Sequence, residues 1–361
     1  MSQSADVPIP PDLSRRYSTT ASGRDWLASL PRLVRSGLDR WQLALDLGPG
    51  CLPWHGHGAI VVPVRRLDAD GGPPEPAVLK VAYPHEEAIV ERHALTLWAG
   101  GGAVRLLAAD ADAGALLLER LDAARSLQDV PVDAAVPVWG ELVRRLSVVP
   151  DGRPEWREFG HVAARAEQWS DELPESWEQL GRPFPRWLLE AALEVCQTRG
   201  AVGRRSGKDV LVHTDLHFSN ILARPVRSGG RGVLGVAGGS AEATSTAASY
   251  AAIDPQPMIG EAEFAVAPLL WNRIPELSRA DPERGLLERC RDFSAAAGLD
   301  AEAARQWSLA REVDNALWYA SQARHEGDLA RSLWVASTLA GRTLPGLPAA
   351  HDLPVPGTAA A

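Results

Sequence analysis

The sequence predicts an α+β fold with two lobes, a β-rich lobe followed by a mainly helical one. Short runs of apolar and β-branched residues are concentrated in the first third of the chain, within residues 60–121. Apolar residues at helical spacing dominate the remainder. Strands followed by helices indicate the α+β class, because segregated elements pack as a sheet against a helical layer. In the helical part, one short polar loop, residues 213–220, separates two further apolar runs.

Composition excludes several classes of protein. The chain has 361 residues, of which 45% are hydrophobic and 23% charged, so it has room for two lobes with cores of their own. A net charge of −9 argues against a nucleic-acid partner, and an acidic surface favours a cationic small molecule. We expect no membrane partner and a cytoplasmic location, because no apolar run approaches the length of a span and no signal-peptide core is present. Nothing indicates an oligomeric state.

The first residues contain helices but no strands. Residues 1–22 are polar and Pro-rich, and we expect poor order there. From Arg24 to Trp41 apolar residues recur at helical spacing, interrupted by Pro31 and Gly37. This pattern predicts two short helices that pack on the outside of the first lobe.

A glycine-containing turn precedes the first long β run, residues 60–67. Gly56 and Gly58 lie in this turn. Glycine lets backbone N–H groups approach phosphate oxygens without an intervening side chain, so the turn is a candidate phosphate cover. An ordinary hairpin turn is an equally good interpretation of the two glycines alone.

The next β run, residues 77–82, has a lysine at its centre. Lys80 is surrounded by apolar residues, and an unpaired buried ammonium is costly, so it needs a partner or a ligand. A helix follows, and among its acidic residues Glu91 is the first candidate for an ion pair with Lys80 and Glu87 the second. The alternative is a lysine on an exposed strand face and two surface glutamates.

Two more strands end the β-rich part. They are expected at residues 103–108 and 115–121. If the second strand connects the lobes, the main chain of Glu119 and Leu121 lies where it can contact the edge of a bound base. Helices are then expected at residues 136–148, 156–169, 187–199, 264–271, 285–297, 301–325 and 329–339.

The polar loop has the form H-x-D-x-x-x-x-N. Asp215 and Asn220 have the spacing of a phosphotransferase catalytic loop, in which the carboxylate orients the acceptor hydroxyl and the amide helps to hold a magnesium ion. His213 opens the loop, and it is either a proton carrier or, as we favour, a structural brace. Further along, a short β run ends at Asp254, where kinases place their second magnesium ligand. An Asp-Pro turn is the alternative for that residue.

Together these motifs resemble a known family, the aminoglycoside/hydroxyurea phosphotransferases, which include the streptomycin 6-kinases. The resemblance runs from about residue 11 to about residue 341. The segments that carry it are residues 77–80, 84–98, 102–107, 116–121, 213–220 and 253–272.

The resemblance implies a bilobal protein-kinase-like fold. Residues 1–121 would be the nucleotide-binding lobe with its N-terminal helices, 122–345 the helical lobe with the catalytic loop and substrate site, and 346–361 a flexible tail. It also implies ATP or GTP and Mg²⁺ as cofactors. The implied roles are catalysis for Asp215, Asn220 and His213, metal binding for Asn220 and Asp254, and nucleotide binding for Lys80, Glu91, Gly56, Gly58, Glu119 and Leu121.

The implied activity is phosphorylation of a hydroxyl on a small molecule, an aminoglycoside of the streptomycin type or hydroxyurea. Three features depart from the family pattern. Thr214 stands where glycine is usual, Ala265 where an aspartate bracing the catalytic loop is expected, and the segment 227–249 is longer than expected. The alternatives are therefore a kinase of another small metabolite, such as a sugar or amino alcohol, and a nucleotide-binding pseudokinase without transfer activity.

Overall fold

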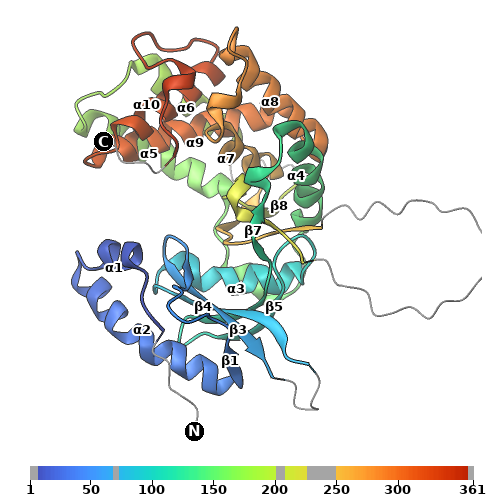
Figure 1. Cartoon of the computed structure of the whole chain (residues 1–361). Coiled ribbons are helices and arrows are strands. Elements are labelled where there is room, and N and C mark those ends of the chain that lie inside the picture. Colours follow the sequence, from blue (N-terminus) through green and yellow to red (C-terminus); the bar gives the residue numbers. More distant parts are fainter. Residues whose placement is uncertain (1–6, 68–72, 201–207, 226–248, 357–361) are drawn as a thin grey trace, which may run out of the picture.

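The computed structural model describes residues 7–67, 73–200, 208–225 and 249–356, and these form two lobes (Figure 1). The N-terminal lobe contains an antiparallel sheet with the strand order β1-β3-β4-β6-β5, to which β2 adds by pairing with β3. Its strands are β1 (Leu43–Leu45), β2 (Trp54–His55), β3 (Ala59–Arg66), β4 (Glu75–Ala82), β5 (Leu106–Asp110) and β6 (Ala115–Glu119). Its helices are α1 (Pro11–Tyr17), α2 (Ala21–Arg40) and α3 (Glu86–Trp98).

The central strand β4 has two different faces, because side chains along a strand alternate between them. Ala77, Leu79 and Val81 point to one side and are buried in a core with the apolar residues of α2. Val78 belongs to the other core, which includes the apolar face of α3. Lys80 lies on the same face as Val78, so the strand presents the Lys80 ammonium to α3 and to the space between the lobes.

The N-terminal region differs from its prediction in two respects. The segment expected to be poorly ordered includes α1, which is anchored by the fully buried Leu13. The two helices expected between Arg24 and Trp41 are one continuous helix, α2, with Pro31 inside it. Proline removes a hydrogen bond from a helix, but α2 buries an unbroken apolar stripe against the sheet, and this burial offsets the loss. As predicted, the helices pack on the outside of the lobe.

The C-terminal lobe is mainly helical. Its helices are α4 (Val132–Leu146), α5 (Val162–Gln179), α6 (Arg186–Arg199), α7 (Ala267–Leu270), α8 (Pro282–Ala297), α9 (Ala301–Ser321) and α10 (Glu326–Leu339). The helix predicted over 156–169 is divided into a 3₁₀ turn (Pro154–Glu158) and α5. Five short strands complete the lobe: β7 (Asp122–Ser126), β8 (Val210–His213), β9 (Ile221–Ala223), β10 (Tyr250–Ala252) and β11 (Pro257–Gly260).

The end of the chain also differs from its prediction as a flexible tail. A 3₁₀ turn (Ala350–Asp352) packs on the helical lobe, with Ala350 and Leu353 buried. Arg331 of α10 donates a hydrogen bond of 2.9 Å to the Pro354 carbonyl. Residues 357–361 and, apart from Ser249, the long segment 227–249 lie outside the described residues.

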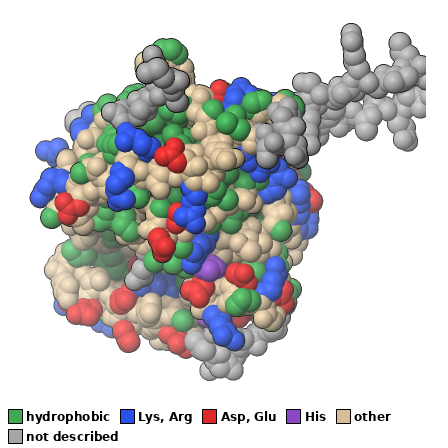
Figure 2. Space-filling model, turned by 90° about the horizontal axis from the view of Figure 1, so that it is seen from below, with side chains coloured by type: hydrophobic (Ala, Val, Ile, Leu, Met, Phe, Trp, Pro, Cys, Tyr) green, Lys and Arg blue, Asp and Glu red, His purple; other side chains and the backbone are tan. Residues whose placement is uncertain are grey.

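The surface carries charges of both signs. On the face seen in Figure 2, acidic and basic side chains lie among one another. In the part of the chain that the structure describes, no helix has the length and apolar character needed to cross a membrane.

Candidate active site

Two strand pairs bring the two predicted site loops together. Strand β8 pairs with β11, and β9 pairs with β10, so that the loop joining β8 to β9 lies beside the loop joining β10 to β11. The first loop contains Asp215 and Asn220, and the second contains Asp254. A hydrogen bond of 2.9 Å from the Ile253 N–H to the Asn220 carbonyl joins them directly.

Asp215 and Asn220 contact each other across their loop. The Asn220 side-chain amide donates to the Asp215 carbonyl at 3.0 Å and to the Asp215 carboxylate at 3.2 Å. These bonds use the amide nitrogen of Asn220 and not its side-chain oxygen. The Asp215 carboxylate also lies 3.6 Å from a ring nitrogen of His217.

His213 joins the two loops and is 2% exposed. Its Nδ1 accepts from the Asp215 N–H at 3.3 Å, and its Nε2 lies 3.1 Å from the Ile253 carbonyl. This pattern requires the neutral ring with its proton on Nε2, donated to that carbonyl. Burial lowers the pKa of His213 to about 4, and the ring stacks against Trp98. These contacts favour the structural brace over the proton carrier.

Thr214 occupies the position where glycine was expected. Its hydroxyl donates to the Gln256 carbonyl at 2.7 Å, and its N–H reaches the same oxygen at 3.3 Å. The β-branched residue therefore forms a bond between the two loops that a glycine could not form.

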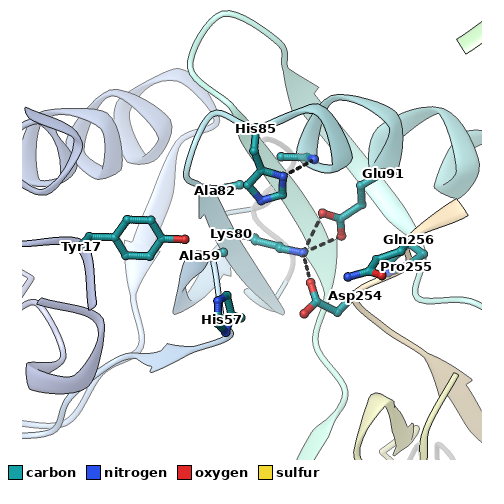
Figure 3. A pocket seen from close by; sticks show the side chains of 12 residues that line it. Tyr17, His57, Ala59, Lys80, Ala82, His85, Glu91, Asp254, Pro255 and Gln256 are labelled. Carbon is teal, nitrogen blue, oxygen red and sulfur yellow. Dashed lines mark hydrogen bonds and ion pairs between the residues drawn. The ribbon is translucent and has the colours of Figure 1, made fainter. Parts of the chain in front are cut away.

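Lys80 makes the ion pair predicted for it. Its ammonium lies 2.7 Å from both carboxylate oxygens of Glu91 on α3 and 2.6 Å from Oδ1 of Asp254 (Figure 3). Burial by itself lowers the pKa of Lys80, but the charges of Glu91 and Asp254 more than offset this, so the pKa is raised and the ammonium stays charged. The Lys80 charge in turn lowers the pKa of Asp254. Of the two glutamates considered, the structure places Glu91 against the lysine.

Two cavities meet at this ion pair. One of about 360 Å³ is lined mainly by apolar side chains of both lobes, and Gly56, Glu119 and Leu121 also line it. The other, of about 530 Å³, is more polar and includes Gly58, His57 and Tyr17 (Figure 3). The Gly56–Gly58 turn spans both, and a Cβ on Gly56 would lie 3.4 Å from Oδ2 of Asp254.

Glu119 has a second role that the sequence did not reveal. Its N–H donates to the Arg105 carbonyl at 3.0 Å, and its carboxylate pairs with Arg224 at 2.9 Å. Arg224 follows β9 in the helical lobe and also donates to the Ala103 carbonyl. The pair therefore ties the strand that leaves the first lobe to the catalytic region. No local pattern in the sequence indicates a contact over so long a separation.

The donor set around Asn220 and Asp254 suits a magnesium ion. A carboxylate and an amide oxygen are hard ligands, and both residues line the apolar cavity. In the described ranges no cluster of three or more His, Cys, Asp or Glu side chains is present. Mg²⁺ does not require one, because it commonly takes its other ligands from water and substrate phosphates.

Comparisons with known proteins show the family of the chain. The aminoglycoside/hydroxyurea antibiotic resistance kinase family matches residues 40–323. Streptomycin 6-kinase of Streptomyces griseus is 33% identical over 325 residues, which cover 88% of this chain and 92% of that protein. Hydroxyurea phosphotransferase of Kitasatospora aureofaciens is 36% identical over 353 residues, covering 94% and 87%.

Solved structures share the fold. The choline kinase LicA of Streptococcus pneumoniae has a TM-score of 0.52 at 12% identity, over 86% of this chain and 99% of its own. A GDP complex of an aminoglycoside 2'-phosphotransferase-IIIa mutant has the same score and identity, over 86% and 97%. At this identity the likeness shows the fold alone.

Fold, site and relatives together define a phosphotransferase that uses a nucleotide and transfers to a hydroxyl group. More specifically, the chain belongs to the aminoglycoside/hydroxyurea antibiotic resistance kinase family. The predicted fold class and family are confirmed. The roles of the individual site residues remain predictions.

Proposed function

We propose that this protein transfers the γ-phosphoryl group of ATP or GTP, with Mg²⁺, to a hydroxyl of a small antibiotic. The acceptor would be a streptomycin-type aminoglycoside or hydroxyurea, as the names of the relatives indicate. The observation that carries the proposal is the convergence of Asp215, Asn220 and Asp254 from paired loops, beside a buried Lys80–Glu91 pair. Phosphoryl transfer requires these groups, because it depends on positioning and charge stabilisation.

The nucleotide would lie between the lobes. Its base fits the apolar cavity, where the main chain of Glu119 and Leu121 would contact the base edge. Its phosphates would then extend below the Gly56–Gly58 turn toward the Lys80 ammonium. Glu91 fixes that ammonium through both of its oxygens.

Asp215 would perform the central step. It would orient the acceptor hydroxyl toward the γ-phosphorus and accept its proton as the new P–O bond forms. The bond from the γ-phosphorus to the β–γ bridging oxygen breaks, and ADP or GDP leaves. Asn220 and Asp254 would hold Mg²⁺, which when bound supplies positive charge to the phosphate oxygens.

Acidic side chains of the helical lobe take part in structural contacts. Several of them already have structural partners: Glu261 binds Arg199 and the Trp307 indole, and Asp314 lies 3.6 Å from Arg165. These contacts give both carboxylates a structural role within the helical lobe. A sugar or amino alcohol remains the alternative acceptor.

The test is nucleotide-dependent phosphorylation of a panel: streptomycin, other aminoglycosides, hydroxyurea, amino sugars and amino alcohols. Each is assayed with ATP and with GTP, with and without Mg²⁺. Asp215→Asn is the matched variant, because the amide keeps an oxygen that accepts from Asn220 but cannot take the proton. We expect turnover of streptomycin or hydroxyurea and a loss of about 10²–10⁴-fold in kcat in the variant. Turnover confined to sugars or amino alcohols would contradict the proposed substrate class.

A further inference from the structure

The catalytic loop lacks the carboxylate that we expected to brace it. Ala265 is 2% exposed and lines a void of about 10 Å³ together with His213 and Leu216. A carboxylate side chain accepts hydrogen bonds. The methyl group of alanine cannot, so another feature must hold the loop.

Side-chain donors hold the loop through its carbonyl oxygens instead. The guanidinium of Arg311, on α9, donates to the Thr214 carbonyl. The Trp139 indole donates to the Leu216 carbonyl at 3.1 Å. The Asn220 amide donates to the Asp215 carbonyl at 3.0 Å. Side chains therefore fix the carbonyls of three successive residues, 214–216, and the proposed base is the middle one.

The segment that lacks the aspartate also contacts Arg311. Its guanidinium lies over the ring of Phe264 at 5.2 Å and over that of Trp271 at 5.1 Å. Phe264 directly precedes Ala265, and Trp271 follows it by less than two helical turns. Aromatic rings stabilise a cation that lies over them. The segment therefore still supports the loop, but through an arginine rather than directly.

Thr214 completes the arrangement. Its carbonyl accepts from Arg311, and its hydroxyl donates to Gln256 on the loop of Asp254. Of the three departures from the family pattern, Thr214 and Ala265 thus lie in two segments that Arg311 connects beside Asp215.

We propose that Arg311 is a positioning residue, which with Thr214 takes the place of the carboxylate absent at position 265. The inference rests on the proposed function, because the group being positioned is Asp215. Arg311 keeps the Asp215 carboxylate directed at the acceptor hydroxyl. Thr214 connects the loop that contains Asp215 to the loop that contains Asp254.

Arg311→Ala tests the proposal, with Arg305→Ala as the matched control. Arg305 lies on the same helix and also donates to a backbone carbonyl, that of Leu339, away from the catalytic loop. Because a misplacement of about 1 Å can cost about 100-fold, we expect kcat to fall by roughly that factor in Arg311→Ala, with the KM for the nucleotide within about twofold. Arg305→Ala should keep its kcat within about twofold. Equal kcat values in the two variants would overturn the proposal.

A second pair of variants covers the case in which Arg311→Ala does not fold. Thr214→Ser keeps the hydroxyl, and Thr214→Val keeps the shape but loses it. We expect kcat near the wild-type value for serine and about tenfold lower for valine, in line with one lost hydrogen bond. Equal activity of the two would contradict the role of Thr214.

Amide hydrogen exchange of residues 213–220 separates this inference from the proposed function. If no acceptor is phosphorylated by the wild-type protein, the proposed function fails, yet the loop can still be measured. We expect faster exchange in Arg311→Ala than in the wild type and in Arg305→Ala. Unchanged exchange in folded Arg311→Ala would show that Arg311 does not hold the loop.

Discussion

Individual charged and polar residues of the site are kept in one protonation state by their neighbours. Lys80 is almost fully buried, yet two carboxylates within 2.7 Å keep it charged. His213 is equally buried, and its contacts are a backbone N–H and a backbone carbonyl, so the neutral ring is favoured. The two buried groups therefore have opposite charge states. Lys80 is charged because its partners are ions, and His213 is neutral because its partners are peptide groups.

The lowered pKa of His213 makes stability depend on pH. Burial sets it at about 4 in the folded state, against an ordinary value of 6.5 in the unfolded chain. Between these values the unfolded state binds more protons, so stability is lost as the pH falls from about 6.5 toward 4. The two values imply that His213 accounts for about 3 kcal/mol of this loss at pH 4.

Urea unfolding of the wild type and of His213→Asn at pH 7 and pH 4 measures this contribution. Between pH 7 and pH 4, the free energy of unfolding of the variant should fall by about 3 kcal/mol less than that of the wild type. His55→Asn, at an exposed histidine, controls for the general loss of an imidazole and should behave as the wild type does. The same loss in all three proteins would show that His213 is not responsible.

Among the structural elements, the turn between β2 and β3 depends on the absence of a side chain. A Cβ on Gly58 would lie 3.1 Å from Nε2 of His85 and 3.2 Å from the Tyr17 hydroxyl. His85 caps α3, where its Nδ1 accepts from the Ala88 N–H at 3.2 Å, and Tyr17 packs on Trp26 and Tyr83. Either these packed side chains or the turn must therefore shift by a few tenths of an ångström.

Gly58→Ala should therefore weaken nucleotide use more than it weakens the fold. We expect the KM for the nucleotide to rise by about three- to tenfold, because the turn would cover the phosphates less closely. The free energy of unfolding should change by less than about 1 kcal/mol. Gly152→Ala is the matched control, since nothing lies within 4 Å of the added methyl group. A KM increase of equal size in the control would refute the role of the turn.

The elements themselves were predictable to different degrees. Strand β4, α3 and the two site loops could be identified because their local patterns coincide with chemical requirements. The N-terminal helix α1 and the C-terminal 3₁₀ turn were missed. Each is anchored by one or two buried residues, such as Leu13 and Leu353, in sequence that is otherwise polar or rich in Pro and Ala. Arg311 and Arg224 were missed for another reason. Their partners are remote in the chain, and only the tertiary fold brings them together.

At the scale of the whole molecule, the proposed nucleotide site connects the lobes. Val78 and Lys80 of the first lobe line the same cavity as Asn220 and Asp254 of the second. A ligand there contacts both lobes and binds only the folded state. It must therefore raise the free energy of unfolding, by about 2.7 kcal/mol at a ligand concentration of 100 times Kd.

Magnesium should control the size of that effect through Asp254. We expect ATP with Mg²⁺ to raise the Tm of the wild type by roughly 3–6 °C, and ATP with a chelator to raise it much less. Asp254→Asn replaces the charged metal ligand by a neutral group of the same shape, so its Tm shift should no longer depend on Mg²⁺. Asp151→Asn, a change at an exposed carboxylate remote from the cavity, should respond as the wild type does. If Asp254→Asn kept the full dependence on Mg²⁺, the ion would be held by other groups. The nucleotide would then connect the two lobes without a metal contact from Asp254.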